Sequence, residues 1–133
     1  MRTEEPRAIR LADYREPEFQ IEKVALDFAL HPNATRVTAN LTLTQRTAGA
    51  PLMLLGEGLK LISIRLDGRA LTAGEYNVDN ETLTIADVPD HFTLETVCEI
   101  APAANTALEG LYLSNGMFCT QCEPEGFRRI TWF

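Results

Sequence analysis

The sequence predicts an all-β domain, an antiparallel β-sandwich or saddle-like sheet, and three observations carry this prediction. Short stretches of alternating apolar and polar residues recur between residues 19 and 100, Asp67-Gly68 is a strong hairpin signal, and no convincing amphipathic helix interrupts them. A period of two places successive side chains on opposite faces of a strand. About seven short strands at this close spacing are typical of a sandwich.

The chain has the size of one domain, at 133 residues, and contains no internal repeat or interdomain linker. Residues 1–18 mix charged residues with two prolines and show no clear period, which predicts an arm. Residues 19–133 are predicted to form the β-domain. Such a domain buries enough surface to need no disulfide or metal to hold its core.

The first predicted strand occupies residues 24–30, where the larger apolar side chains share one face. These are Val24, Leu26, Phe28 and Leu30. Phe19 and Ile21 are out of phase with this face, so a bulge or bend is expected near Glu22-Lys23.

The clearest strand follows a turn at Pro32-Asn33 and carries a Thr-rich face opposite an apolar one. The apolar face consists of Val37, Ala39, Leu41 and Leu43. Asp67-Gly68 then marks a hairpin, and a second hairpin is expected to turn at about residues 79–81. The strand before the first turn alternates through Ile62, Ile64 and Leu66, and a later one through Phe92, Leu94, Thr96, Cys98 and Ile100.

The long C-terminal segment, residues 101–133, is predicted to be rich in loops, with a turn at residues 114–116 and a strand at residues 117–121. Its many aromatic and apolar side chains need packing partners. The final residues therefore form either a last core strand or part of a domain that the chain does not complete. We expect the second, a truncated domain.

The net charge of −7 argues against nucleic-acid binding and against binding to anionic membranes, and Arg128-Arg129 is the only adjacent basic pair. No apolar run reaches the length of a signal peptide or a membrane span. Three cysteines are an odd number, which fits a reducing compartment better than a disulfide framework. These features predict a cytoplasmic protein.

Cys119 and Cys122 have the spacing of zinc ligands, but a structural zinc site needs four. The remaining candidates, Cys98, His31 and His91, are isolated in the sequence, so no metal ligand is expected in this chain. A redox role is disfavoured because Cys122 runs into Glu-Pro-Glu-Gly, which starts no obvious helix and adds negative charge. We interpret the two cysteines as half-buried thiols beside a functional loop.

Gln121 and Glu123 flank Cys122, so in an extended backbone their side chains share a face. A carboxylate beside an amide can bind an ammonium group through charge and directional hydrogen bonds. A plain exposed strand edge is the alternative interpretation of this pair. No nucleophile motif or phosphate-binding loop occurs, so no catalytic residue is expected in this chain.

The stretches NTALEGLY and CTQCEPEGFRRITWF, with DYREPEFQIEKVALDFAL upstream, resemble the N-terminal domain of the bacterial aminopeptidase N family. These are zinc metallo-aminopeptidases of the gluzincin superfamily. The resemblance covers nearly the whole chain. It implies a non-catalytic domain whose partner is a catalytic domain of the same polypeptide, and peptide substrates with a free N-terminus. Zinc would be bound by that catalytic domain, whose His-Glu-x-x-His and Gly-Ala-Met-Glu-Asn motifs are absent here.

The resemblance also implies roles for two residues of the TQCE stretch. Glu123 would pair with the α-ammonium of the substrate, and Gln121 would line the pocket for the first side chain. Two other hypotheses stay open from the residues alone: a stand-alone β-sandwich binding module without activity, and a redox or zinc protein using the Cys-x-x-Cys motif. The reading frame beyond residue 133 distinguishes the stand-alone module from an aminopeptidase. Metal analysis with thiol titration tests the redox or zinc protein.

Overall fold

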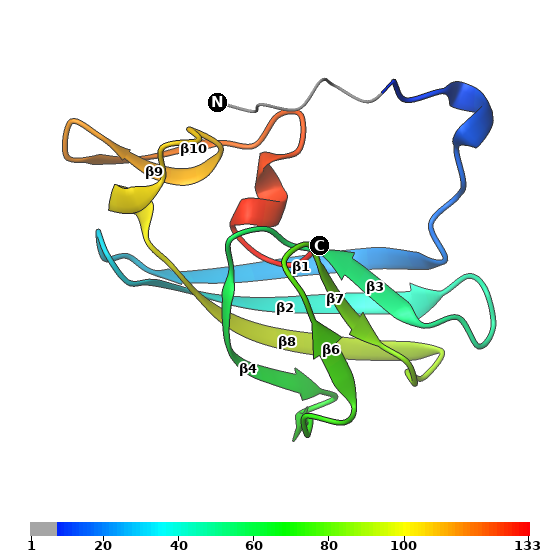
Figure 1. The fold of residues 1–133 in the computed structure, drawn as a ribbon. Coiled ribbons are helices and arrows are strands. Elements are labelled where there is room, and N and C mark those ends of the chain that lie inside the picture. Colours follow the sequence, from blue (N-terminus) through cyan, green and yellow to red (C-terminus); the bar gives the residue numbers. More distant parts are fainter. Residues whose placement is uncertain (1–7) are drawn as a thin grey trace.

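The computed structural model of the protein describes residues 8–133, which form ten strands and three short 3-10 helices (Figure 1). The strands are β1 (Phe19–Ala29), β2 (Thr35–Gln45), β3 (Leu52–Leu55), β4 (Lys60–Leu66), β5 (Arg69–Ala70), β6 (Tyr76–Val78), β7 (Thr82–Ile85), β8 (His91–Ile100), β9 (Gly110–Ser114) and β10 (Met117–Gln121). The 3-10 helices are η1 (Leu11–Asp13), η2 (Pro102–Ala104) and η3 (Gly126–Arg129). Residues 1–7 of the predicted arm lie outside the described residues, and residues 8–18 are exposed.

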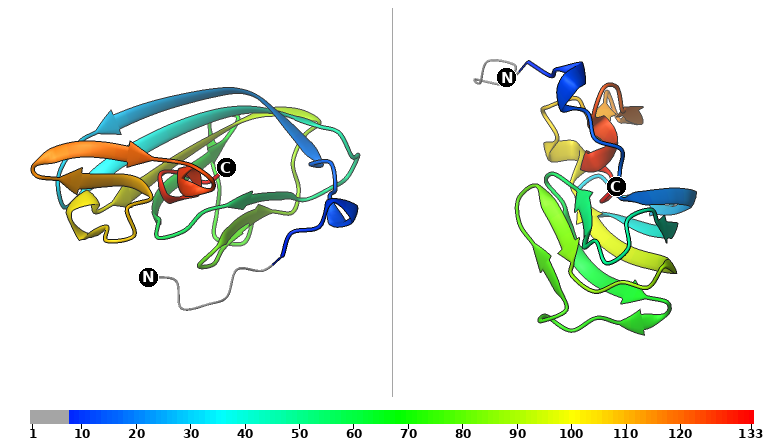
Figure 2. Two further views of the ribbon diagram at one scale, coloured as in Figure 1. Left: turned by 90° about the horizontal axis from the view of Figure 1, so that it is seen from above. Right: turned by 90° about the vertical axis from the view of Figure 1, so that its right-hand side faces the viewer.

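The predicted all-β antiparallel fold is confirmed, because every strand pair in the described residues is antiparallel. A five-stranded sheet has the order β1-β2-β8-β4-β5, and a three-stranded sheet has the order β3-β7-β6. These two sheets form the layers of the sandwich (Figure 2). The pair β9–β10 is a separate hairpin, and η3 lies between it and the sandwich (Figure 1).

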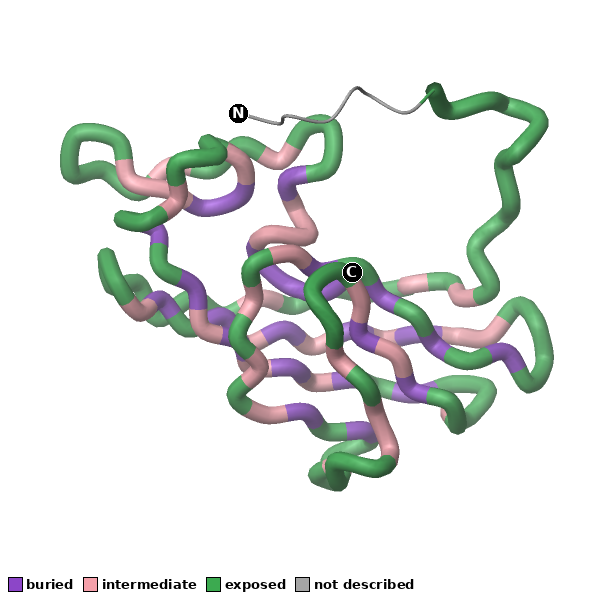
Figure 3. The backbone as a smooth tube through the Cα atoms, in the orientation of Figure 1, coloured by how far each residue is buried: buried purple, intermediate pink, exposed green. Residues whose placement is uncertain are grey.

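The core lies between the two large sheets and is built on β2 and β8 (Figure 3). The predicted inward face of β2 is confirmed, since its four apolar side chains are at most 1% exposed. In the β2–β8 register Leu41 faces Leu94 and Val37 faces Cys98, so the apolar faces of both strands coincide. Leu52, Leu54, Leu83 and Ile85 cover them from the smaller sheet.

Strand β1 is an edge strand, and its pairing shifts between Ile21 and Lys23, which confirms the expected bulge. Val24 pairs with Leu41, so its predicted face points the same way as the core face of β2. Val24 and Phe28 nevertheless remain 39% and 38% exposed. They lie on β1, the edge strand of the five-stranded sheet. Leu30 was predicted on the same face, but it lies beyond the end of β1 and is 54% exposed.

Both predicted hairpins are confirmed. Asp67 and Gly68 form the β4–β5 turn with φ of 49° and 81°, and Asp79 accepts the backbone N–H groups of Glu81 and Thr82 in the β6–β7 turn. The prediction for Ile62 is wrong. The β4–β8 pairing shifts between Leu61 and Ser63, which leaves Ile62 37% exposed.

The C-terminal residues pack into the sandwich. Trp132 is 1% exposed and lies against Gly56, where a Cβ atom would collide with its indole ring. Leu55 and Phe133 exchange backbone hydrogen bonds of 2.8 and 3.0 Å, so the last residues run beside the end of β3. Among residues 8–133 no helix has the length and apolarity to cross a membrane.

Candidate functional site

The candidate site is the loop of residues 122–125, which joins β10 to η3 and is called here the β10–η3 loop. Gln121 is the last residue of β10 and pairs with Gly110 of β9, while Glu123 lies inside the loop. Both are exposed, and neither side chain makes a hydrogen bond or ion pair with the described part of the chain. The shared face of Gln121 and Glu123 was expected for an extended backbone, but β10 ends at Gln121 and Glu123 lies beyond the strand.

The base of this loop is closed by backbone contacts. The Gly126 N–H donates to the Cys122 carbonyl at 2.7 Å. A Cβ atom at Gly126 would collide with the Gln121 carbonyl oxygen, and one at Gly110 would lie 2.8 Å from Cβ of Arg129. Gly110 also has φ of 75°, a conformation that favours glycine. Two glycines therefore allow the hairpin and η3 to approach each other, and the loop projects from this junction.

The hairpin that carries Gln121 is well defined. The predicted turn is confirmed, with Asn115 and Gly116 at φ of 50° and 79°, and the predicted strand at residues 117–121 is β10 itself. Strand β9 was not expected, because the segment was interpreted as loop. The sequence interpretation missed Asn105, whose amide donates to the Glu109 and Leu111 carbonyls at 2.7 and 2.9 Å.

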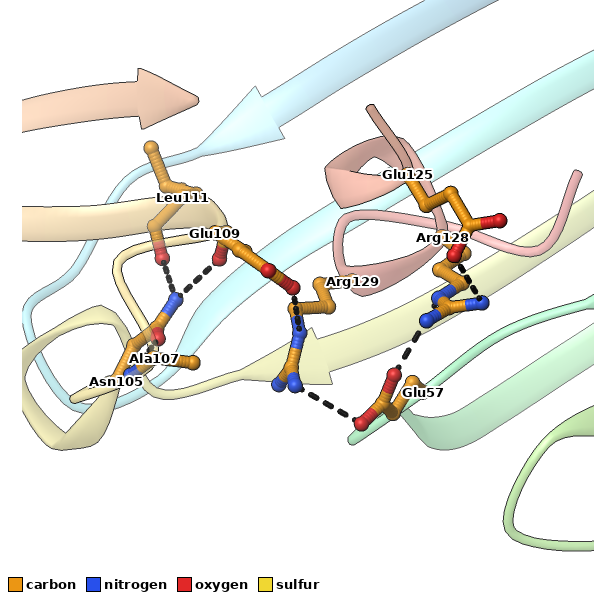
Figure 4. A network of polar contacts seen from close by, with 8 residues as sticks. All are labelled: Glu57, Asn105, Ala107, Glu109, Leu111, Glu125, Arg128 and Arg129. Atoms are coloured by element: carbon orange, nitrogen blue, oxygen red, sulfur yellow. Dashed lines mark hydrogen bonds and ion pairs between the residues drawn. The ribbon is translucent and has the colours of Figure 1, made fainter. Parts of the chain in front are cut away.

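A network of ion pairs connects η3 to both the hairpin and the sandwich (Figure 4). Arg129 contacts Glu57 at 2.8 Å and Glu109 at 3.2 Å, and Arg128 contacts Glu57 at 3.3 Å and Glu125 at 3.2 Å. The two arginine side chains are 25% and 23% exposed, so water screens these pairs only in part. The sequence showed an adjacent basic pair but no partner for it. The short helix η3 was not expected either.

The cysteines do not form a common site. Cys119 and Cys122 are half-buried, as predicted, whereas Cys98 is buried in β8 and its thiol donates to the Ile130 carbonyl at 3.3 Å. Burial raises the pKa of Cys98 to about 11, although a hydrogen bond with the Val37 backbone lowers it in part. Within residues 8–133 no three His, Cys, Asp or Glu side chains are grouped as a metal site requires. The described residues therefore do not fit a zinc ion.

The fold identifies the class of protein. Aminopeptidase A of Legionella pneumophila, solved with aspartic acid, matches 93% of this chain with a TM-score of 0.83 and 27% identity, over 15% of its own length. An M1 zinc metallopeptidase of Deinococcus radiodurans matches 86% of the chain with a TM-score of 0.70 at 13% identity, which shows a shared fold. The protein has the N-terminal β-domain fold of M1 zinc metallopeptidases.

Curated relatives define the family, although no protein-family model matches the chain. Aminopeptidase N of Caulobacter vibrioides is 59% identical over 135 residues, covering 100% of this chain and 16% of the relative. Aminopeptidase N of Escherichia coli is 45% identical over 132 residues, covering 98% of this chain and 15% of the relative. The chain therefore matches the N-terminal part of these much longer aminopeptidase N proteins, which confirms the resemblance seen in the sequence.

Proposed function

We propose that this chain is the non-catalytic N-terminal β-domain of a zinc-dependent aminopeptidase that removes N-terminal amino acids from peptides. The observation that carries the proposal is the 59% identity to an aminopeptidase N along the whole chain. On this proposal the β10–η3 loop anchors the substrate. Glu123 pairs with the α-ammonium group, and Gln121 supplies a directional hydrogen bond and lines the pocket for the first side chain.

The geometry of the loop supports this role in two ways. Both side chains are exposed, so a ligand reaches them without displacing an internal partner. The loop base is closed by the Cys122–Gly126 hydrogen bond, which limits its movement. Anchoring the α-amine at a fixed point sets the register of the peptide, so only its first peptide bond reaches the catalytic centre. Such positioning accounts for an exopeptidase.

The zinc of the proposed enzyme belongs to another part of the polypeptide. The described residues hold no suitable ligand group, and no step of the reaction is assigned to them beyond binding and orienting the substrate. We therefore expect this chain alone not to hydrolyse peptides. Its three cysteines are unpaired, which supports a reducing, cytoplasmic location.

The partner that we propose for the domain is the catalytic domain of the same polypeptide. An apolar groove of about 830 Å³ runs between β1 and the C-terminal residues, and Val24, Leu26, Leu55, Phe127 and Phe133 line it. Apolar surface of this kind marks interfaces. The relatives are several times longer than this chain, so they have residues to cover it. A reading frame that continues into Gly-Ala-Met-Glu-Asn and His-Glu-x-x-His supports the proposal; a stop codon directly after Phe133 supports a stand-alone module.

The loop is tested by Glu123→Ala in the full-length enzyme. Losing a charged partner for the α-ammonium costs on the order of 2–4 kcal/mol in kcat/KM, which is roughly 30- to 1000-fold. Gln121→Ala removes a neutral hydrogen bond and costs about 0.5–1.5 kcal/mol. The measurement is steady-state kinetics on an aminoacyl anilide. Unchanged kinetics for Glu123→Ala would refute the proposed anchoring.

Two further variants separate the anchoring from a general charge effect. Glu81→Ala removes an exposed carboxylate from the β6–β7 turn and changes the net charge by the same amount as Glu123→Ala. It controls for the attraction of a cationic substrate to an acidic protein, and we expect little change. Glu123→Gln keeps the size of the side chain, so a loss close to that of Glu123→Ala assigns the effect to the charge.

A further inference from the structure

The β10–η3 loop has two ends that belong to different parts of the molecule. One end is Gln121 on the hairpin, and the other is Gly126 at the start of η3. The hairpin itself forms no strand pairing with either large sheet in residues 8–133. The position of the loop relative to the sandwich therefore depends on what joins the hairpin, η3 and the sandwich to one another.

The side chain of Arg129 contacts all three parts through ion pairs or its own place in η3 (Figure 4). It lies in η3, its Nε donates to Glu109 directly before β9, and its Nη2 donates to Glu57 in the segment after β3. Glu109 precedes Gly110, the residue that pairs with Gln121. The guanidinium group thus connects the strand opposite Gln121 to the sandwich through two charge-assisted hydrogen bonds of 3.2 and 2.8 Å.

The backbone around Arg129 makes the same junction tight. A Cβ atom added at Gly110 would lie only 2.8 Å from Cβ of Arg129, which is too close for two side chains. The Glu57 N–H donates to the Arg128 carbonyl at 2.9 Å, so Glu57 holds η3 through its backbone as well as its carboxylate. Arg128 adds a contact from Glu57 to Glu125, the last residue of the loop.

Arginine suits this position because its guanidinium is a rigid planar fork that directs several N–H groups at once. A lysine has one flexible ammonium group, which does not reproduce two bonds in fixed directions. Both carboxylates are only partly exposed, at 37% for Glu57 and 28% for Glu109. Their pairing with Arg129 is therefore less screened than an ordinary surface ion pair.

We propose that Arg129 is a positioning residue, which sets the place of Glu123 by tying the hairpin and η3 to Glu57 of the sandwich. This inference rests on the proposed anchoring role of Glu123. Arg129 does not contact substrate on this proposal. It fixes the base of the loop, and a shift of about 1 Å at a binding group costs up to roughly 100-fold in rate.

The test is a double-mutant cycle in the full-length enzyme, measured as kcat/KM on an aminoacyl anilide. We expect Arg129→Met, which keeps the apolar stem and loses the fork, to lower kcat/KM about 10-fold or more. In a Glu123→Ala background the same substitution should change kcat/KM less than about twofold, because Arg129 acts through Glu123. Arg129→Lys should recover only part of the loss.

Two variants complete the design. Glu57→Gln weakens the same junction from the sandwich side and should lower kcat/KM in the same direction, so it decides the question if Arg129→Met does not fold. Arg46→Met breaks the exposed 2.9 Å pair with Glu16 instead and should have little effect. An unchanged kcat/KM for both Arg129→Met and Glu57→Gln overturns the inference, and so does an equal loss in the Glu123→Ala background. The kcat/KM of Glu123→Ala alone tests the anchoring proposal, so a failure of that proposal can be distinguished from a failure of the inference about Arg129.

Discussion

The sandwich and the hairpin region of this protein are held together by different forces. The inward residues of β2 are 0–1% exposed, and apolar burial between two sheets stabilises them. In β10 every residue is exposed or half-buried, and the junction below it combines glycine contacts, the Asn105 amide and ion pairs with the burial of one side chain of β9, Leu111. Apolar burial is shared among many side chains and depends little on their exact orientation, whereas the polar contacts at the junction are few and directional.

This difference separates stability from function. Loss of a core side chain should unfold the domain, while loss of a contact at the junction should displace the β10–η3 loop with a smaller cost in stability. We therefore expect substitutions in the region that carries Gln121 and Glu123 to change activity before they change folding. The following expectations test this contrast from the largest effect to the smallest.

The largest expected effect is at Trp132, a large side chain that is only 1% exposed. Trp132→Ala should lower the free energy of unfolding by about 3–5 kcal/mol, because it removes buried contacts and leaves a cavity. Phe118→Ala in β10 truncates an aromatic ring on a residue that is 36% exposed, so it should cost about 1 kcal/mol or less. Urea denaturation followed by circular dichroism measures both values; similar losses would contradict the proposed division of the molecule.

The second effect concerns Cys98 and alkaline pH. Its pKa in the folded protein is about 11, raised from 9.0 by burial, so the unfolded chain ionises first. The stability that this thiol contributes is present below pH 9 and is lost as the pH rises toward 11. The expected loss is about 2–3 kcal/mol, since each pKa unit corresponds to about 1.4 kcal/mol.

Cys98→Ala isolates this thiol from other groups that titrate at alkaline pH. The variant has no thiol to ionise at position 98, so its stability should fall less steeply between pH 9 and 11 than that of the natural chain. Parallel pH profiles for the two proteins would show that Cys98 is not responsible. Thiol titration of the native protein adds a second measurement, in which half-buried Cys119 and Cys122 should react before buried Cys98.

The contrast between the two regions also explains which features could be predicted from sequence. The core strands were predictable because their information is local, as in the alternation that places Leu41 and Leu94 inward. The ion pair of Arg129 and Glu57 joins residues 72 positions apart, and no local pattern announces it. The exposure of Val24 and Phe28 was unpredictable for the same reason, since it depends on the strand order, which places β1 at the edge of its sheet.

The proposed roles of Gln121 and Glu123 came from resemblance rather than from periodicity. Their residue types indicate an ammonium-binding pair, but an exposed strand edge has the same pattern. The strand at residues 117–121 was visible in the sequence, while its partner β9 was not, because Gly110–Ser114 follows a stretch of turn-forming residues. Local signals thus predicted the strand that ends at Gln121, the resemblance supplied the proposed roles, and contacts between distant residues hold the β10–η3 loop in place.

The smallest expected effect compares two glycines with nearly the same backbone conformation. Gly110 has φ of 75° and Gly49 has φ of 74°, so alanine at either position takes on about 1 kcal/mol of backbone strain. Their surroundings differ, because a Cβ atom at Gly49 meets nothing within 4 Å, whereas one at Gly110 meets Arg129 at 2.8 Å. The difference in the free energy of unfolding between Gly110→Ala and Gly49→Ala therefore measures the close approach of Gly110 to Arg129.

We expect Gly110→Ala to destabilise the chain by about 1 kcal/mol more than Gly49→Ala, because the hairpin and η3 must move apart. In the proposed full-length aminopeptidase, Gly110→Ala should also lower kcat/KM on an aminoacyl anilide, since Gln121 pairs with Gly110 and the loop moves with it. Gly49→Ala, in the turn after β2, should leave kcat/KM unchanged. If both variants lose stability equally and both keep full activity, then the contact between hairpin and η3 does not hold the loop, and the ion pairs alone must do so.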